Sequence, residues 1–334
     1  MKLKIFIFCA IAFSLAYPLL AAGNPDRDMA IQLALDRLEK NTGGQQEYGY
    51  YRENEDSGVT FPAISIPGAY SQPAQETRFI RSDLVGNTAS ELGTEVSHIT
   101  YKEPGVMQQT GVMHGFNASY SYYGWLPPLP EWNDKSMLRL EARYSYGKVD
   151  YKNSGTVDNI KDYMIEGRGL IGYVFQKPAN FSIIPYLGFG YRYLNDDMGG
   201  KESSTGASGY ERESNYVYIP IGAELNTSLN SGWFLGTTLE FDIFVKGKQI
   251  SRLSDVDPEC PDISNRQRNG YGLRGSLKIQ RKLENIFFVF EPFIRYWNIK
   301  RSEDTYFVYN NSLWYGVEPR NNSLEYGLKL GLKF

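Results

Sequence analysis

Two histidines, His98 and His114, are the only ones in the chain and are the first residues to examine for catalytic chemistry. A histidine that activates water needs a second group, commonly a carboxylate, within hydrogen-bond reach. No Asp-x-His sequence occurs, and His114 shares strand parity with Phe116 on an apolar face. The pattern does not fix the parity of His98, which follows Ser97. We therefore predict a protein without enzymatic activity and keep a hydrolase as an alternative.

A glycine motif is the next candidate for ligand chemistry. Gly167 to Gly172 matches G-x-G-x-x-G. A dinucleotide site needs a helix directly after these glycines. Here Tyr173 to Phe175 continue an alternating strand instead. The glycines are better explained as room for large neighbouring side chains, so we predict no cofactor.

An acidic segment resembles the start of a calcium-binding loop. It contains Asp255, Asp257 and Glu259, but Cys260 stands where that loop requires glycine, and no closing glutamate follows. We predict no metal site and keep these three acids as a weak candidate only. Since Cys9 lies in the leader, Cys260 is the one cysteine of the mature chain, and no internal disulfide can form.

Charged residues of both signs recur on the polar face of successive strands. In 137–149, for example, Leu138, Leu140 and Ala142 share one parity, and Arg139 and Glu141 share the other. Facing inward, such charges can pair across strands and offset their desolvation. We predict that these charges form a network lining the lumen, the interior of a closed sheet. It consists of Arg139, Glu141, Arg143, Glu166, Arg168, Arg192, Glu224, Glu240, Asp242, Lys246, Arg274, Lys278, Glu291, Arg295, Glu325 and Lys329.

Alternating segments of roughly ten residues must position these charges. They cover residues 94–103, 112–123, 137–149, 163–175, 184–194, 215–226, 233–246, 271–280, 286–297 and 324–334. Short connections alternate with long polar ones at about 148–162, 195–214, 247–269 and 300–322, as in outer-membrane barrels. An apolar face in lipid requires every backbone group to be paired, so the sheet must close. We predict an all-β fold, a closed antiparallel transmembrane β-barrel of about ten strands over 94–334. The count falls to eight if 94–123 is not a hairpin.

The N-terminal part differs in character from the barrel. Residues 1–22 have a basic start at Lys2 and Lys4, an apolar run and small residues at the end, which is typical of a cleaved signal peptide. Residues 23–93 combine one short helix over 24–41 with an irregular linker. This periplasmic segment either docks weakly, which we favour, or plugs the barrel.

Composition excludes two broad classes. The formal net charge is -3, whereas nucleic-acid binders usually carry a strong basic excess. Aromatic residues make up 15% of the chain, which is too many for a mostly disordered protein.

The end of the chain carries a family resemblance. Its last strand alternates and closes on a terminal Phe, with Tyr326, Leu328, Leu330, Leu332 and Phe334 on one parity. This resembles the C-terminal assembly signal of Gram-negative outer-membrane β-barrel proteins. The resemblance implies location in the outer membrane. It also implies the barrel assembly machinery, periplasmic chaperones, outer-membrane lipid and lipopolysaccharide as partners.

Function is less constrained than fold, because this superfamily includes structural barrels, adhesins, narrow pores, omptin proteases and lipid A-modifying enzymes. We predict a non-enzymatic barrel with an envelope-structural or surface-interaction role through its long outer loops, chiefly Lys201 to Glu213 and Ser302 to Arg320. The alternatives are a narrow diffusion pore for small solutes and a rim hydrolase. Balanced lumen charge and a count near eight strands favour an occluded interior over a pore.

Overall fold

A computed structural model describes residues 87–124, 126, 135–176 and 180–334 of the chain. The predicted signal peptide, the helix over 24–41 and residues 23–86 of the possible plug lie outside these residues, whereas residues 88–93 of that segment belong to a strand. Across the described residues, no helix is both long and apolar enough to cross a bilayer.

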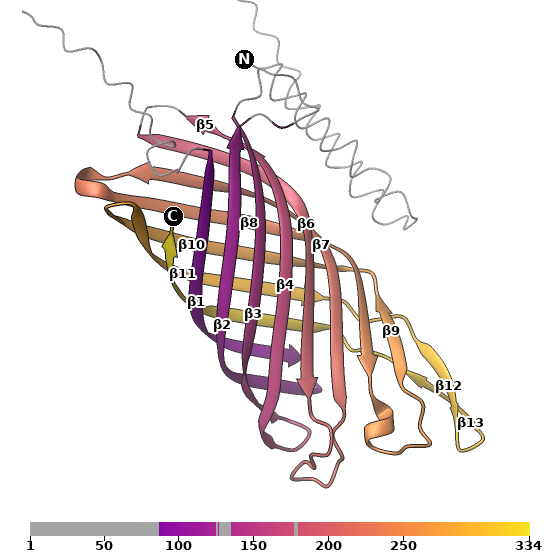
Figure 1. Cartoon of the computed structure of the whole chain (residues 1–334). Helices are drawn as coiled ribbons and strands as arrows, with labels where there is room; N and C mark the ends of the chain where they lie inside the picture. The colour runs from indigo at the N-terminus through magenta and orange to yellow at the C-terminus, as the bar shows by residue number, and fades with distance from the viewer. Residues whose placement is uncertain (1–86, 125, 127–134, 177–179) are drawn as a thin grey trace, which may run out of the picture. The chain divides into compact units, whose positions relative to one another are not determined.

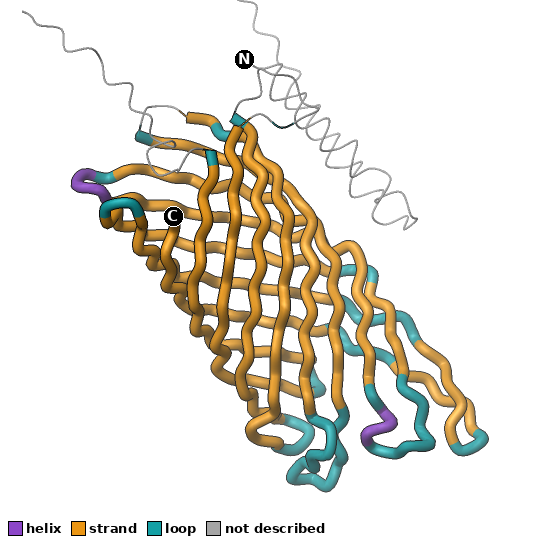
Figure 2. Tube along the Cα trace, viewed as in Figure 1, coloured by secondary structure: helices purple, strands orange, loops and turns teal. Residues whose placement is uncertain are grey.

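Ten long antiparallel strands close into a barrel, which confirms the predicted fold class (Figures 1 and 2). The ring closes where β1 pairs with β14, for example His98 opposite Tyr326. The first two strands form a hairpin, so the eight-strand alternative is wrong. In ring order the strands are β1 (Thr88–Glu103), β2 (Met107–Gly124), β3 (Ser136–Lys152), β4 (Val157–Tyr173), β6 (Phe181–Asp197), β7 (Glu211–Ser228), β8 (Trp233–Ser251), β10 (Gly270–Leu283), β11 (Ile286–Ile299) and β14 (Asn321–Lys333).

Shorter elements decorate this ring. A two-residue strand, β5 (Phe175–Gln176), extends the pairing with β6, and β9 (Ile263–Gln267) pairs with the end of β8. The hairpin β12 (Thr305–Tyr309) and β13 (Ser312–Gly316) forms a separate two-stranded sheet. Two 3-10 turns, η1 (Asn230–Gly232) and η2 (Leu253–Asp255), lie in connections.

The two ends of the barrel differ in their connections. At one end the chain terminus pairs with the first strand, since Ser90 and Phe334 exchange backbone hydrogen bonds of 2.7 and 2.9 Å. The two-residue turn Glu284-Asn285 lies at this end, and Glu284 has the positive φ of 53° that a tight hairpin turn needs. The connections 198–210, 252–269 and 300–320 lie at the opposite end, which we call the loop end (Figure 1).

Strand boundaries differ from the predicted ones. The first strand begins at Thr88 instead of residue 94, and the predicted loop 148–162 shrinks to 153–156 because β3 and β4 extend toward each other. These strands therefore extend further than the alternation alone indicated.

Large apolar side chains cover the outer wall. Phe116, Phe189 and Leu239 are each more than half exposed on this surface. A water-soluble barrel would bury such residues, whereas lipid accepts them. Together with the closed ladder, which leaves no edge to satisfy, this outer belt suits a bilayer.

Candidate functional site

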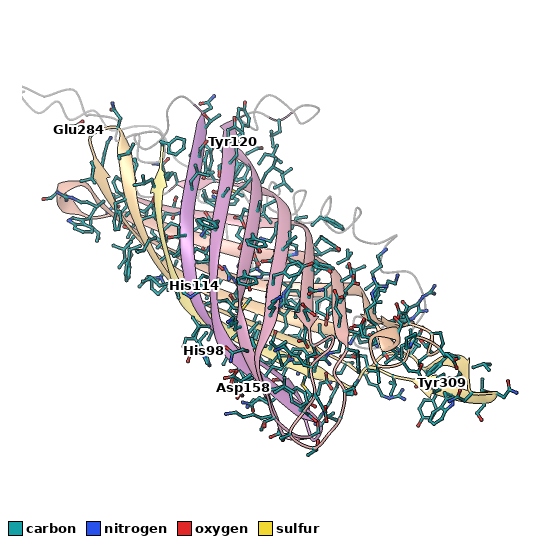
Figure 3. The ribbon with its side chains drawn as sticks, turned by 60° about the horizontal axis from the view of Figure 1, so that its bottom comes forward. His98, His114, Tyr120, Asp158, Glu284 and Tyr309 are labelled. Atoms are coloured by element: carbon teal, nitrogen blue, oxygen red, sulfur yellow. The ribbon has the colours of Figure 1, made fainter. Side chains whose placement is uncertain are left out.

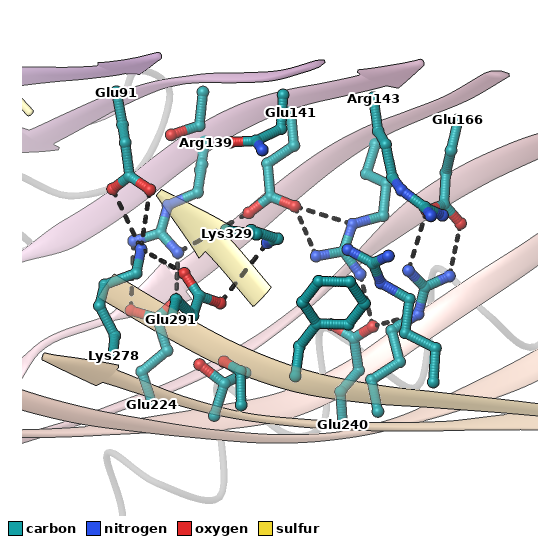
Figure 4. Close-up of a pocket in the computed structure, with 18 of the residues that line it drawn as sticks. Glu91, Arg139, Glu141, Arg143, Glu166, Glu224, Glu240, Lys278, Glu291 and Lys329 are labelled. Carbon is teal, nitrogen blue, oxygen red and sulfur yellow. Dashed lines mark hydrogen bonds and ion pairs between the residues drawn. The ribbon is translucent and has the colours of Figure 1, made fainter. Parts of the chain in front are cut away.

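The barrel interior is the candidate site, because it gathers the predicted charge network. Apart from Lys246, each predicted lumen residue carries a buried or partly buried side chain inside the barrel (Figure 4). The charges lie in levels along the barrel axis (Figure 4), the first of them nearest the end that holds Phe334.

Lys246 is a correction to the sequence prediction. The pairing of β7 with β8 shifts register between Val217 and Tyr218, so that Tyr218 faces Phe244 and Val217 faces Lys246. The extra residue, Val245, reverses the parity of the rest of the strand. Phe244 is consequently buried in the lumen, and Lys246 is exposed on the outer wall.

Two lysines organise the first level. Lys278 lies 3.1 Å from Glu91 and 3.3 Å from Glu291, and Lys329 lies 3.5 Å from the same Glu291. On the facing wall, Arg139 forms an ion pair with Glu224. The contacts of Glu291 join neighbouring strands, whereas Lys278–Glu91 and Arg139–Glu224 each join strands three places apart in the ring.

Two arginines bridge the middle level. Arg168 lies 2.5 Å from both Glu141 and Glu240. The Tyr186 hydroxyl also donates a hydrogen bond of 2.7 Å to Glu240. The second arginine, Arg274, is 2.5 Å from Glu166 and 2.7 Å from Asp242.

A four-membered cluster lies beside this level. Arg143 is 2.5 Å from Glu95 and also pairs with Glu325, and Arg295 lies 3.4 Å and 3.3 Å from the same two carboxylates. The Ser97 hydroxyl donates a further hydrogen bond of 2.8 Å to Glu325. All four charged side chains are more than nine-tenths buried.

Sequence reasoning missed Glu91 and Glu95. Both lie on β1, whose start and parity were not fixed. A signal was present, since Glu91, Gly93, Glu95 and Ser97 share one parity.

Aromatic side chains pack against one another in the lumen toward the loop end. Tyr218 and Trp297 meet edge to face with ring centroids 5.0 Å apart, and Tyr216 and Phe244 do so at 5.4 Å. A Cβ on Gly190 would overlap the Tyr218 ring, so only glycine leaves space for it. The buried Arg192 guanidinium lies 5.6 Å from the centre of the Trp297 ring.

This packing leaves little open space. The charged level encloses a cavity of about 110 Å³, lined by Arg139, Glu141, Arg168, Glu240 and their neighbours. That volume holds only a few water molecules. Since the arginines and lysines that line this cavity contact carboxylates, the arrangement can cross-link the wall. Among the described residues, no group of three His, Cys, Asp or Glu side chains is arranged to hold a metal ion.

A second polar cluster lies at the loop end of the lumen. Arg212 is 2.6 Å from Glu103 and 2.9 Å from Asp196. The Tyr101 hydroxyl donates to Glu103 at 3.1 Å and to Glu318 at 3.2 Å. Glu318 belongs to the 300–320 loop, so this cluster fixes the base of that loop over the barrel mouth.

Burial raises the pKa of Glu318 to about 7; the nearby Glu103 carboxylate adds to this, while Arg212 opposes it. Because the folded pKa exceeds the ordinary 4.5, docking of the loop is strongest while Glu318 is protonated. Docking therefore weakens as the pH rises from about 4.5 to about 7. We expect amide exchange in 300–320, corrected for intrinsic rates, to be faster at about pH 8 than at about pH 5.

Glu318→Gln is the matched variant, because it stays neutral and keeps an acceptor for Tyr101. Its exchange should be the same at both pH values. A pH dependence that persists in this variant would show that Glu318 is not its source.

Both histidines lie on the outer wall (Figure 3). His98 contacts Tyr326, with ring centroids 5.4 Å apart. His114 is exposed and borders an outer groove with Phe116, Tyr144 and Leu328. Neither makes an ion pair among the described residues.

In the acidic loop that was the weak metal candidate, Asp255 and Asp257 accept hydrogen bonds from groups of the protein itself. Asp255 accepts from the Glu211 backbone N–H at 2.9 Å. Asp257 accepts from the Tyr309 hydroxyl and from the Glu259 N–H. These bonds lower the pKa of Asp257. The loop is thus held by internal hydrogen bonds.

No protein-family model matches the chain, and no curated protein matches its sequence. Among solved structures, it is similar to the outer membrane protease OmpT from Escherichia coli, with a TM-score of 0.49 and 10% identity, over 75% of this chain and 96% of that one. It is also similar to the translocator domain of the autotransporter NalP from Neisseria meningitidis (TM-score 0.38, 9% identity, 74% and 88% covered). A third similar structure is Ail, the attachment invasion locus protein of Yersinia pestis (TM-score 0.27, 12% identity, 74% of this chain and 99% of that one covered). By its closed ladder and apolar outer belt, the chain is a transmembrane β-barrel.

Proposed function

We propose that this protein is a non-enzymatic outer-membrane barrel that acts through its outer loops and does not conduct solutes. One observation carries the proposal: cross-linked charges and aromatic rings fill the lumen and leave neighbouring cavities of only about 110 and 100 Å³. A filled barrel leaves its exposed loops as the surface available for function. The long connections 198–210, 252–269 and 300–320 all lie at one end.

The test compares cells that display the intact chain with cells in which 199–209, 254–261 and 303–316 are replaced by short turns. Adhesion to a cell monolayer should fall to the background of cells without the protein once the loops are shortened. Uptake of a small hydrophilic solute should not depend on expression. Raised uptake without adhesion would favour the narrow pore instead.

We also propose that the outer wall binds phosphate groups of lipopolysaccharide. Lys148 and Lys161 lie directly opposite each other on β3 and β4, both exposed, and no ion pair among the described residues includes either. Like charges in this position repel unless an anion bridges them. Two residues further along these strands, toward the membrane, the next pair of outward-facing side chains is Tyr146 and Tyr163. Tyrosine is expected at a bilayer interface.

The double variant Lys148→Gln and Lys161→Gln tests this contact. In vesicles that contain lipopolysaccharide, its midpoint of thermal unfolding should fall by about 5 °C relative to the unaltered protein, since each lysine near an anionic surface contributes about 1 kcal/mol. In zwitterionic vesicles the two proteins should unfold at the same temperature. An equal loss in both lipids would point to a structural effect.

A further inference from the structure

The β12–β13 hairpin presents an apolar face with no partner among the described residues. Tyr306 lies opposite Tyr315, and Val308 lies opposite Leu313, so all four share one face. They are 66%, 63%, 65% and 73% exposed in that order. We call these four residues the hairpin face. Exposed apolar groups at this density mark an interaction site.

The opposite face of the hairpin is anchored to the barrel. The Tyr309 hydroxyl donates to Asp257, and Asn265 donates to the Gly316 carbonyl at 2.9 Å and to the Thr305 hydroxyl at 3.1 Å. Asn310 and Asn311 both have positive φ, as a tight two-residue turn requires. An isolated two-stranded hairpin is only marginally stable, so these contacts hold the hairpin face in position.

The chemistry of the segment favours lipid over protein as the occupant. Residues 305–316 contain no charged side chain, so no charge complementarity selects a protein partner. The hairpin face exposes on the order of 500 Å², less than the roughly 800 Å² per partner of a standard protein interface. Tyrosine prefers the boundary between headgroups and acyl chains, and the hairpin face carries Tyr306 and Tyr315.

The position of the hairpin indicates which bilayer it meets. On the outer wall, Lys248 lies opposite Arg266, both exposed, at the level where β8 pairs with β9. The hairpin starts beyond this basic row, where the Thr305 hydroxyl donates to the Ser264 carbonyl at 2.8 Å. Figure 1 shows the hairpin projecting at the loop end, away from Phe334. The apolar core of the barrel's own membrane lies on the other side of that row.

We propose that the hairpin face inserts into the headgroup boundary of an apposed phospholipid bilayer. This inference rests on the proposed surface function and names its partner. Among the described residues, the two strands form a ladder only with each other, which leaves backbone groups at their outer edges. Those groups need water, so insertion stops at the interface and does not reach the hydrocarbon core.

The test uses the full mature protein in nanodiscs, which expose the loop end, and measures flotation with phosphatidylcholine vesicles. The unaltered protein should float with the vesicles. The variant Y306S/V308S/L313S/Y315S should bind at least roughly tenfold more weakly, because it loses four apolar side chains. The matched control is V106S/V256S, which changes two exposed valines outside the hairpin and should bind as the unaltered protein does.

A second readout is quenching of Trp314 fluorescence by brominated lipid, taken as the difference between the unaltered protein and Trp314→Phe. Quenching by vesicles supports insertion. The absence of quenching, together with no flotation, overturns the proposal. The proposal is also overturned if the quadruple variant changes only the oligomeric state, because a second copy of the chain would then be the occupant. If shortening the loops abolishes cell adhesion but the protein in nanodiscs does not bind vesicles, the proposed surface function stands and the proposed lipid partner is wrong.

Discussion

Arg143→Met should lower the free energy of unfolding by about 3–5 kcal/mol, the usual cost of removing one partner from a buried ion pair. Arg143 contacts both Glu95 and Glu325, and all three side chains are at least nine-tenths buried. Methionine fills similar volume but leaves the two carboxylates with Arg295 as their one ion-pair partner among the described residues, at 3.4 and 3.3 Å. Urea unfolding of the refolded barrel in lipid vesicles measures the change.

Arg268→Gln is the control, because Arg268 also pairs with a carboxylate, Glu303, but both side chains are at least half exposed. Exposed pairs contribute little, so this variant should unfold at the same urea concentration as the unaltered protein. Restoring neutrality with Glu325→Gln on the Arg143→Met background should recover part of the loss. Equal stability of Arg143→Met and the unaltered protein would show that water reaches the cluster and screens it.

Strand parity made the lumen residues predictable, and local irregularity limited that prediction. A period of two assigns Arg139, Glu141 and Arg143 to one face with no knowledge of the fold. A single bulge at Val245 was enough to move Lys246 outward, and no residue type marks it in the sequence.

Pairing across the lumen was beyond the sequence for a different reason. Arg143 and Glu325 are 182 residues apart, and they meet only because the ring closes with one particular stagger between its first and last strands. Alternation fixes which face a side chain takes but not its height in the barrel. The cross-links that fill the lumen therefore had to come from the structure.

The β12–β13 hairpin shows how a local signal can be hidden by a larger pattern. Residues 300–322 were expected to form a long polar loop, and that expectation was wrong for 305–316. The sequence Tyr-Phe-Val-Tyr-Asn-Asn-Ser-Leu-Trp-Tyr has strand formers on both sides of an Asn-Asn turn. The hairpin stands apart from the barrel ladder, so the ten-strand count did not require it.

The double variant Arg168→Ser and Glu240→Ser should convert a silent barrel into a conducting one. The proposed function requires the unaltered mature protein to show no steady single-channel current in a planar bilayer. Removing this pair takes away one charge of each sign, so the lumen stays balanced. Glu141 retains Arg139 at 3.9 Å, and Arg274 retains Glu166 and Asp242. Fold and stability should therefore largely survive.

The physical reason is that Arg168 and Glu240 project from opposite walls into the cavity of about 110 Å³ and meet there at 2.5 Å. Two serines in their place would enlarge this cavity, which shares lining residues such as Arg139, Glu141 and Lys278 with the neighbouring one of about 100 Å³. Conductance should rise at least roughly tenfold above the bilayer background, as a widened ten-stranded lumen admits water and ions.

Recording both proteins with and without residues 23–86, which precede β1, separates closure by the lumen from closure by the N-terminal segment. Current from the unaltered barrel after this deletion alone would mean that the segment plugs an open pore, and the lumen network would then be its lining. Silence of the unaltered barrel in both forms, with current only in the double variant, places the barrier at Arg168 and Glu240. In that case the chain acts at its outer surface, because a barrel closed by ion pairs has no other route to a partner outside the cell.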